Sequence, residues 1–107
     1  MQQISAQALA EWLADEQREN PVLLDVREPW EHEMGHIKGT FLMPMHTVPV
    51  RLSELQTEST IVCICHHGGR SMQVAAFLDS RGFAEVYNLA GGMDHWSQTV
   101  DSSIKRY

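Results

Sequence analysis

Short apolar runs alternate with amphipathic stretches along this chain. The runs VLLDV at 22–26, TIVCIC at 60–65 and AEVYNL at 84–89 have the length and composition of buried strands. A weaker run, TFLM at 40–43, precedes Pro44 and predicts a further short strand. The 60–65 run is the strongest of these predictions, because it is apolar, rich in β-branched residues and uninterrupted.

Helical patterns fill the segments between these runs. Ser5 is a suitable N-cap for the first helix, and Gly82, followed by Phe83, is a suitable end for the strongest one. The predicted helices cover 6–18, 28–34, 47–55, 70–82 and 91–100.

The alternation of strands and helices predicts an α/β fold. Its sheet should be mainly parallel, with helices on both faces. A length of 107 residues predicts a single domain spanning 1–107.

Charge and composition exclude several classes of protein. A formal net charge of −6 disfavours nucleic-acid binding, and no apolar run is long enough to cross a membrane. The N-terminus lacks the pattern of a secretory signal. The two cysteines are only two residues apart, so a disulfide between them would be badly strained. These features predict a cytoplasmic protein with free thiols.

The segment CICHHGGRSM at 63–72 carries the candidate chemistry. Cys65 ends the strongest strand, at the edge of the sheet where α/β proteins place their sites. Gly68 and Gly69 allow the backbone to curl its N–H groups inward, the following helix adds its N-terminus, and Arg70 adds a cation. This environment predicts a pKa of Cys65 below that of an ordinary thiol, and hence a nucleophilic thiolate facing solvent. Cys63, inside the strand, is better interpreted as an inert core residue, or as a neighbouring thiol that intercepts a persulfide.

Three segments together resemble the rhodanese superfamily of sulfurtransferases. They are LLDVREPWEHEMGHIKGT, CHHGGRS and GFAEVYNLAGGMDHW, in that order, and the likeness covers nearly the whole chain. Thr40 is a minor departure, since the family often has Ala there. The resemblance implies a five-stranded, mainly parallel sheet, with Ile4 beginning the first strand.

The resemblance also implies a reaction. Cys65 would take a sulfur from a small-molecule donor such as thiosulfate and carry it as a persulfide. It would pass the sulfur to cyanide or to a thiol acceptor, either a small thiol or a thioredoxin-like protein. No metal or cofactor would be needed. The implied substrate-binding residues are His66, His67, Gly68, Gly69, Arg70, which would hold a sulfonate, and Ser71.

Two other functions remain open at this point. A phosphatase or arsenate reductase on the same fold would use a loop one residue longer than the six residues from Cys65 to Arg70. A binding or sensing module could keep the fold without catalysis. A metal site built on Cys63, Cys65, His66 and His67 is disfavoured by the spacing.

Other notable side chains have structural interpretations. Asp25 and Arg27 are expected to pair and fix the loops rather than to react. His36 is expected to be a packed, hydrogen-bonded residue, and the methionines to be core filler. Trp12 and Trp96 are expected to pack on the sheet, and Trp30 could border the pocket mouth.

Overall fold

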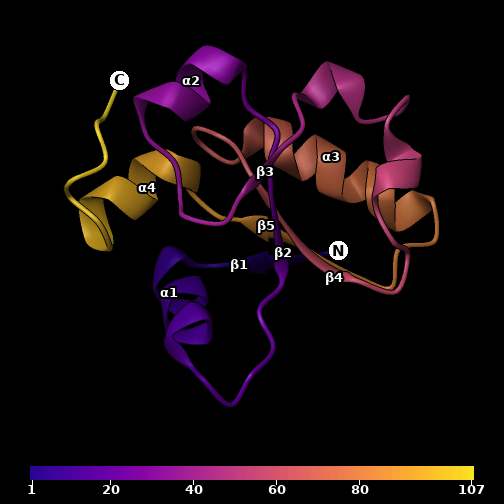
Figure 1. The fold of residues 1–107 in the computed structure, drawn as a ribbon, viewed down its shortest axis with the longest axis horizontal. Coiled ribbons are helices and arrows are strands. Elements are labelled where there is room, and N and C mark those ends of the chain that lie inside the picture. Colours follow the sequence, from indigo (N-terminus) through magenta and orange to yellow (C-terminus); the bar gives the residue numbers. More distant parts are fainter.

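The computed structural model describes residues 1–107 and forms one five-stranded parallel sheet with the strand order β1-β5-β4-β2-β3. The strands are β1 (Gln2–Ile4), β2 (Val22–Asp25), β3 (Phe41–Leu42), β4 (Thr60–Ile64) and β5 (Glu85–Leu89). The helices are α1 (Ala6–Ala14), α2 (Pro29–Met34), α3 (Gly69–Ser80) and α4 (Gly92–Thr99), with 3-10 turns η1 (Met45–Thr47) and η2 (Leu52–Glu54). The predicted fold class is confirmed (Figure 1).

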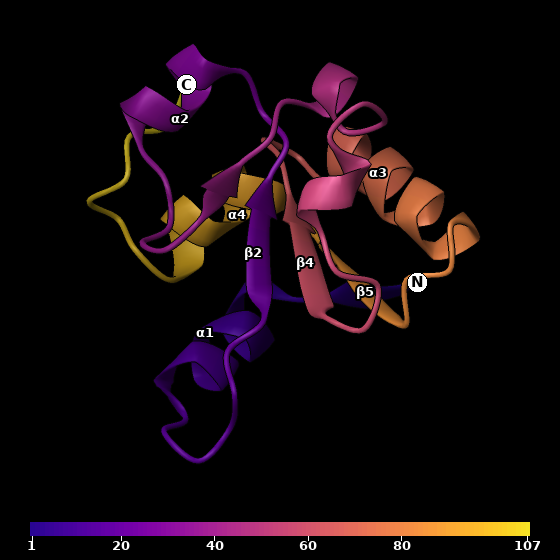
Figure 2. The same ribbon diagram turned by 45° about the vertical axis from the view of Figure 1, so that its right-hand side comes forward.

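The sheet divides the core into two layers. Alternate β4 residues point to opposite faces, so that Ile61 and Cys63 pack with α3 and its neighbours, while Val62 and Ile64 pack with α1 and α4. Figure 2 shows α3 on one side of the sheet and α1 and α4 on the other. Because β4 lies in the middle of the sheet, it is covered on both faces, which explains its apolar composition.

Most element predictions are confirmed, and the errors have local causes. The first helix ends at Ala14 rather than at residue 18, because the N–H of Asp15 bonds to the Trp12 carbonyl in a tighter turn. The predicted helix at 47–55 is wrong. That segment instead holds the end of η1, a turn at 48–51 and the whole of η2, since Pro49 has no N–H with which to continue a helix. Ile4 ends the first strand rather than beginning it.

The expectations for the aromatic and sulfur-containing side chains are confirmed in part. Trp12 and Trp96 are buried against the sheet, as are Met43 and Met93, but Met72 is exposed on α3. His36 is exposed rather than packed. Its ring stacks on His32, and its Nδ1 lies 2.7 Å from the His32 carbonyl. None of the helices is both long and apolar enough to span a bilayer.

Candidate active site

The Cys65 loop lies at the carboxyl end of β4, between that strand and α3. The chain reverses at Gly68, which has φ +101 and serves as the N-cap of α3. A β-carbon there would lie 3.3 Å from the Gly91 nitrogen, so glycine suits both the backbone angle and the space. The helix begins one or two residues earlier than the sequence predicts, at Gly69, because its first turn is part of the loop.

The N-terminus of α4 fixes the outer side of this loop. Met93 donates its N–H to the Cys65 carbonyl at 2.8 Å, and Asp94 donates to the His66 carbonyl at 2.9 Å. A trans peptide unit directs its C=O and N–H to opposite sides, so the N–H groups of His66 and His67 turn away from α4. Gly92 permits this approach, since a β-carbon on it would lie 2.5 Å from both carbonyl oxygens.

The inner side of the loop is rich in backbone donors. Gly68 donates its N–H to the Cys65 Sγ at 3.0 Å. Five further N–H groups have no acceptor within the protein, and they belong to His66, His67, Gly69, Arg70 and Ser71. Such a set of N–H groups, together with the α3 dipole, favours negative charge on a sulfur or an oxyanion held among them.

The buried side chains of Ser71 and Asn88 form a hydrogen-bonded pair next to the Cys65 sulfur. The Ser71 Oγ lies 3.2 Å from the Cys65 Sγ and also hydrogen-bonds the Asn88 Oδ1. Asn88 is fixed by donating to the Gly68 carbonyl at 3.2 Å and to the Gln3 Oε1 at 2.9 Å. One hydroxyl proton cannot serve both acceptors at once, so Ser71 can donate to the sulfur when the sulfur is ionised and to Asn88 when it is not.

The Cys65 sulfur does not face solvent, so that part of the sequence-based expectation is wrong. Cys65 is only 1% exposed, because the alternation along β4 directs residues 61, 63 and 65 toward α3 and the loop then curls over the thiol. A donor therefore reaches the sulfur only when the groups above it move. In a persulfide, an S–S bond of about 2.05 Å would place the outer sulfur closer to the Arg70–Glu31 ion pair described next.

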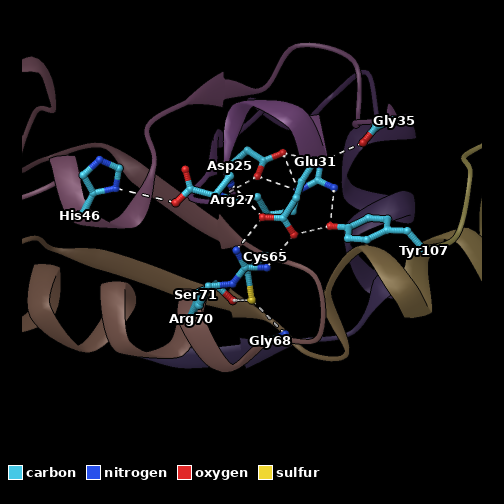
Figure 3. Close-up of polar contacts among 11 residues, drawn as sticks. Asp25, Arg27, Glu31, Gly35, His46, Cys65, Gly68, Arg70, Ser71 and Tyr107 are labelled. Carbon is cyan, nitrogen blue, oxygen red and sulfur yellow. Dashed lines mark hydrogen bonds and ion pairs between the residues drawn. The ribbon is translucent and has the colours of Figure 1, made fainter. Parts of the chain in front are cut away.

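An ion pair forms the rim above the sulfur. Arg70 donates from both terminal nitrogens to the Glu31 carboxylate, at 2.6 and 2.8 Å (Figure 3). In Figure 3 the Arg70 guanidinium lies between the Cys65 sulfur and Glu31. The hydrogen bonds from Arg70 lower the pKa of Glu31 to about 2, and the same contact raises the pKa of Arg70. Burial opposes the first shift but does not overcome it.

A second ion pair, between Arg27 and Asp25, lies next to the Arg70–Glu31 pair. Arg27 and Asp25 are fully buried, and Arg27 donates to both Asp25 oxygens at 2.8 to 3.2 Å and to the Gly35 carbonyl. Burial acts to lower the pKa of Arg27, but the hydrogen bonds and charge of Asp25 raise it. The predicted pairing of Asp25 with Arg27 is therefore confirmed.

Tyr107 links the two ion pairs. Its hydroxyl donates to Glu31 at 2.6 Å and accepts from Arg27 at 3.2 Å. Its ring stacks on His66 with centroids 4.0 Å apart, and Trp30, 56% exposed, meets it edge-on. Trp30 thus stands near the rim, as the sequence suggested.

The two loop histidines are stacked rather than chelating. The rings of His66 and His67 lie 3.9 Å apart at 27°, and together with Asp94 they bring three ligand atoms within 4.8 Å of one another. Ring-nitrogen lone pairs lie in the ring plane, so two nearly parallel stacked rings do not direct their lone pairs at one ion. Burial and the neighbouring His67 lower the pKa of His66, which favours a neutral ring.

Cys63 lies in the core behind the loop. It is fully buried, and burial raises the pKa of its thiol to about 12. The interpretation of Cys63 as a packed thiol fits this environment better than a role in transfer.

Sequence reasoning missed three residues of the site. Glu31 carries a readable signal, since Glu28 and Glu31 have the spacing of a capping box, in which the Glu31 Oε1 accepts from the Glu28 N–H at 2.9 Å. Asn88 is a polar residue inside an apolar strand, which is a weaker signal. Tyr107 carries none, because 76 residues separate it from Glu31.

Comparison with known proteins identifies the family to which this chain is similar. Residues 8–99 match the family model of the rhodanese-like domain. A sulfurtransferase of Allochromatium vinosum is 36% identical over 90% of this chain and 88% of its own length. The thiosulfate sulfurtransferase GlpE of Stutzerimonas stutzeri is 33% identical over 78% of this chain and 77% of its own.

Solved structures are also similar to this chain in both fold and sequence. A crystal structure from Staphylococcus saprophyticus is 33% identical and superposes with a TM-score of 0.84 over 94% of this chain and 97% of its own. A rhodanese-like domain protein of Staphylococcus aureus is 28% identical, with a TM-score of 0.85 over 100% of this chain and 99% of its own. The chain therefore belongs to the rhodanese-like domain family of sulfurtransferases.

Proposed function

We propose that this protein moves sulfane sulfur from a donor to a thiol acceptor through a persulfide on Cys65. The observation that carries the proposal is the set of backbone N–H groups in the loop that follows Cys65: one is hydrogen-bonded to its sulfur, and five have no acceptor in the protein. The relatives named thiosulfate sulfurtransferase support thiosulfate as one donor.

In the first half-reaction, the Cys65 thiolate attacks the outer sulfur of the donor. With thiosulfate, a new S–S bond forms to Cys65, the donor's S–S bond breaks, and sulfite leaves with the bonding electron pair. The N–H groups of residues 66–70 stabilise the anionic persulfide, and Ser71 donates to the Cys65 sulfur. Arg70 lies near the place of the donor's sulfonate but is hydrogen-bonded to Glu31 through both terminal nitrogens.

In the second half-reaction, the thiolate of a small thiol or a thioredoxin-like protein attacks the outer sulfur of the persulfide. The Cys65 thiolate leaves with the electron pair and is ready for another cycle. This ping-pong scheme moves one sulfur atom and requires no metal or organic cofactor.

Intact-mass measurement after incubation with thiosulfate tests the proposal. The wild-type chain and a Cys63→Ala control should each gain one sulfur, and Cys65→Ser should gain none. Transfer by Cys65→Ser to a thiol acceptor would refute the assignment. A folded wild-type chain that takes sulfur from neither thiosulfate nor glutathione persulfide would favour the binding-module alternative, and hydrolysis of an aryl phosphate would favour the phosphatase.

A further inference from the structure

The cations of the active site are already neutralised within the protein. Both terminal nitrogens of Arg70 donate to Glu31, and Arg27 is held by Asp25 in the same way. Each arginine is thus hydrogen-bonded to a carboxylate. The site attracts an anion mainly through N–H dipoles, because the formal charges of these two pairs cancel.

The negative charge of Glu31 is held firmly in place. Its side chain is only 4% exposed and accepts from Arg70, from the Tyr107 hydroxyl and from the Glu28 N–H. The carboxyl has a pKa of about 2, so it stays ionised at neutral pH. Burial lowers the pKa of the nearby His66, which favours a ring without positive charge.

Two classes of sulfur donor respond differently to such a rim. Thiosulfate carries two negative charges next to the sulfur that the Cys65 thiolate must attack. An organic persulfide in its RS–SH form is uncharged at its reacting end. Its transfer is balanced, since Cys65–S⁻ and RS–SH give Cys65–S–SH and RS⁻. A carboxylate above the thiolate opposes the approach of the first donor much more than that of the second.

We propose that Glu31 determines donor specificity by withholding the positive charge of Arg70, so that the site favours an organic persulfide over thiosulfate. This inference rests on the proposed function, because it requires Cys65 to accept sulfur. Tyr107 acts as a positioning residue, because its hydroxyl donates to the Glu31 Oε2, the oxygen that one Arg70 nitrogen also contacts.

Glu31→Gln tests the proposal with little change of shape. The amide keeps an oxygen for the Glu28 N–H and Arg70 but removes the charge. Glu33→Gln is the matched control, because Glu33 is exposed on the same helix and outside the network. Each variant is loaded with thiosulfate or with glutathione persulfide, and the rate of sulfur gain on Cys65 is followed by mass.

Glu31→Gln should load from thiosulfate at least about tenfold faster, because one charge within about 10 Å contributes about this much at an effective dielectric constant of about 20. Its loading from glutathione persulfide should change less than about twofold, and Glu33→Gln should change neither rate by more. An unchanged or slower thiosulfate rate in Glu31→Gln would overturn the proposal. Equal acceleration with both donors would also overturn it, since Glu31 would then not discriminate between them.

A salt series on the wild-type chain is a second test that needs no variant to fold. Because the rim is neutralised, loading from thiosulfate should stay constant or rise as ionic strength rises. A steep fall with salt would reveal an exposed positive charge and contradict the proposal. Absence of loading from both donors would instead count against the proposed function itself.

Discussion

Gly92→Ala should disrupt the contact between α4 and the Cys65 loop. Gly92 has φ +56, and a β-carbon there would lie 2.5 Å from the carbonyl oxygens of Cys65 and His66. Contacts under 3.0 Å are essentially never seen for β-carbons, so α4 must withdraw by about 0.5 Å. That shift stretches the hydrogen bonds from Met93 and Asp94, now 2.8 and 2.9 Å long.

The expected loss has two contributions. The left-handed backbone angle costs an alanine about 1 kcal/mol, and weakening two buried hydrogen bonds costs about 1 kcal/mol each. The free energy of unfolding should therefore fall by about 3 kcal/mol, and the Tm by about 15 °C for a chain of this size. Sulfur loading of Cys65 should also slow, because the same two carbonyls orient the loop N–H groups.

Gly82→Ala is the matched control. Gly82 also has a positive φ, +87, but a β-carbon there would meet no heavy atom within 4 Å. It should cost only the backbone contribution of about 1 kcal/mol. Urea unfolding of both variants measures the difference. If Gly92→Ala and Gly82→Ala lose the same stability, the close approach of α4 does not hold the loop, and the reasoning fails.

Two further predictions concern the ion pairs. Asp25→Asn leaves Arg27 buried without a counter-charge and should lower the free energy of unfolding by about 3 to 5 kcal/mol, measured by urea titration. Glu11→Gln, on an exposed face, should change it by less than about 0.5 kcal/mol, and a similar loss in both variants would contradict the assignment. The folded-state pKa of Glu31, about 2, lies below the value of an unfolded glutamate, so its contribution is present above about pH 4.5 and is lost as pH falls toward 2. Wild type should therefore be about 2 kcal/mol more stable than Glu31→Gln at pH 7, a value that allows for solvent screening at the partly exposed Arg70. This difference in the free energy of unfolding should shrink to nothing as the pH approaches 2. A difference that stays constant with pH would refute the linkage.

The sequence was most informative where local chemistry is sufficient. The apolar run of β4 and the helix pattern that follows it predicted a parallel sheet with Cys65 at its carboxyl edge. Glycine at 68 and 82 marked turns that need a positive φ. The helix predicted at 47–55 failed because Pro49 was judged by its tolerance in a first turn, whereas here it interrupts a longer segment.

The sequence by itself determined most of the elements, the position of Cys65 at the carboxyl end of β4 and the supply of loop N–H groups, because these depend on residues adjacent in the chain. Only the tertiary structure decided what surrounds the sulfur. Arg70 meets Glu31 across 39 residues, and Tyr107 meets Glu31 across 76. No periodicity encodes such contacts, since they arise when separate loops converge at one edge of the sheet. The burial of Cys65 and the neutralised rim are therefore properties of the fold.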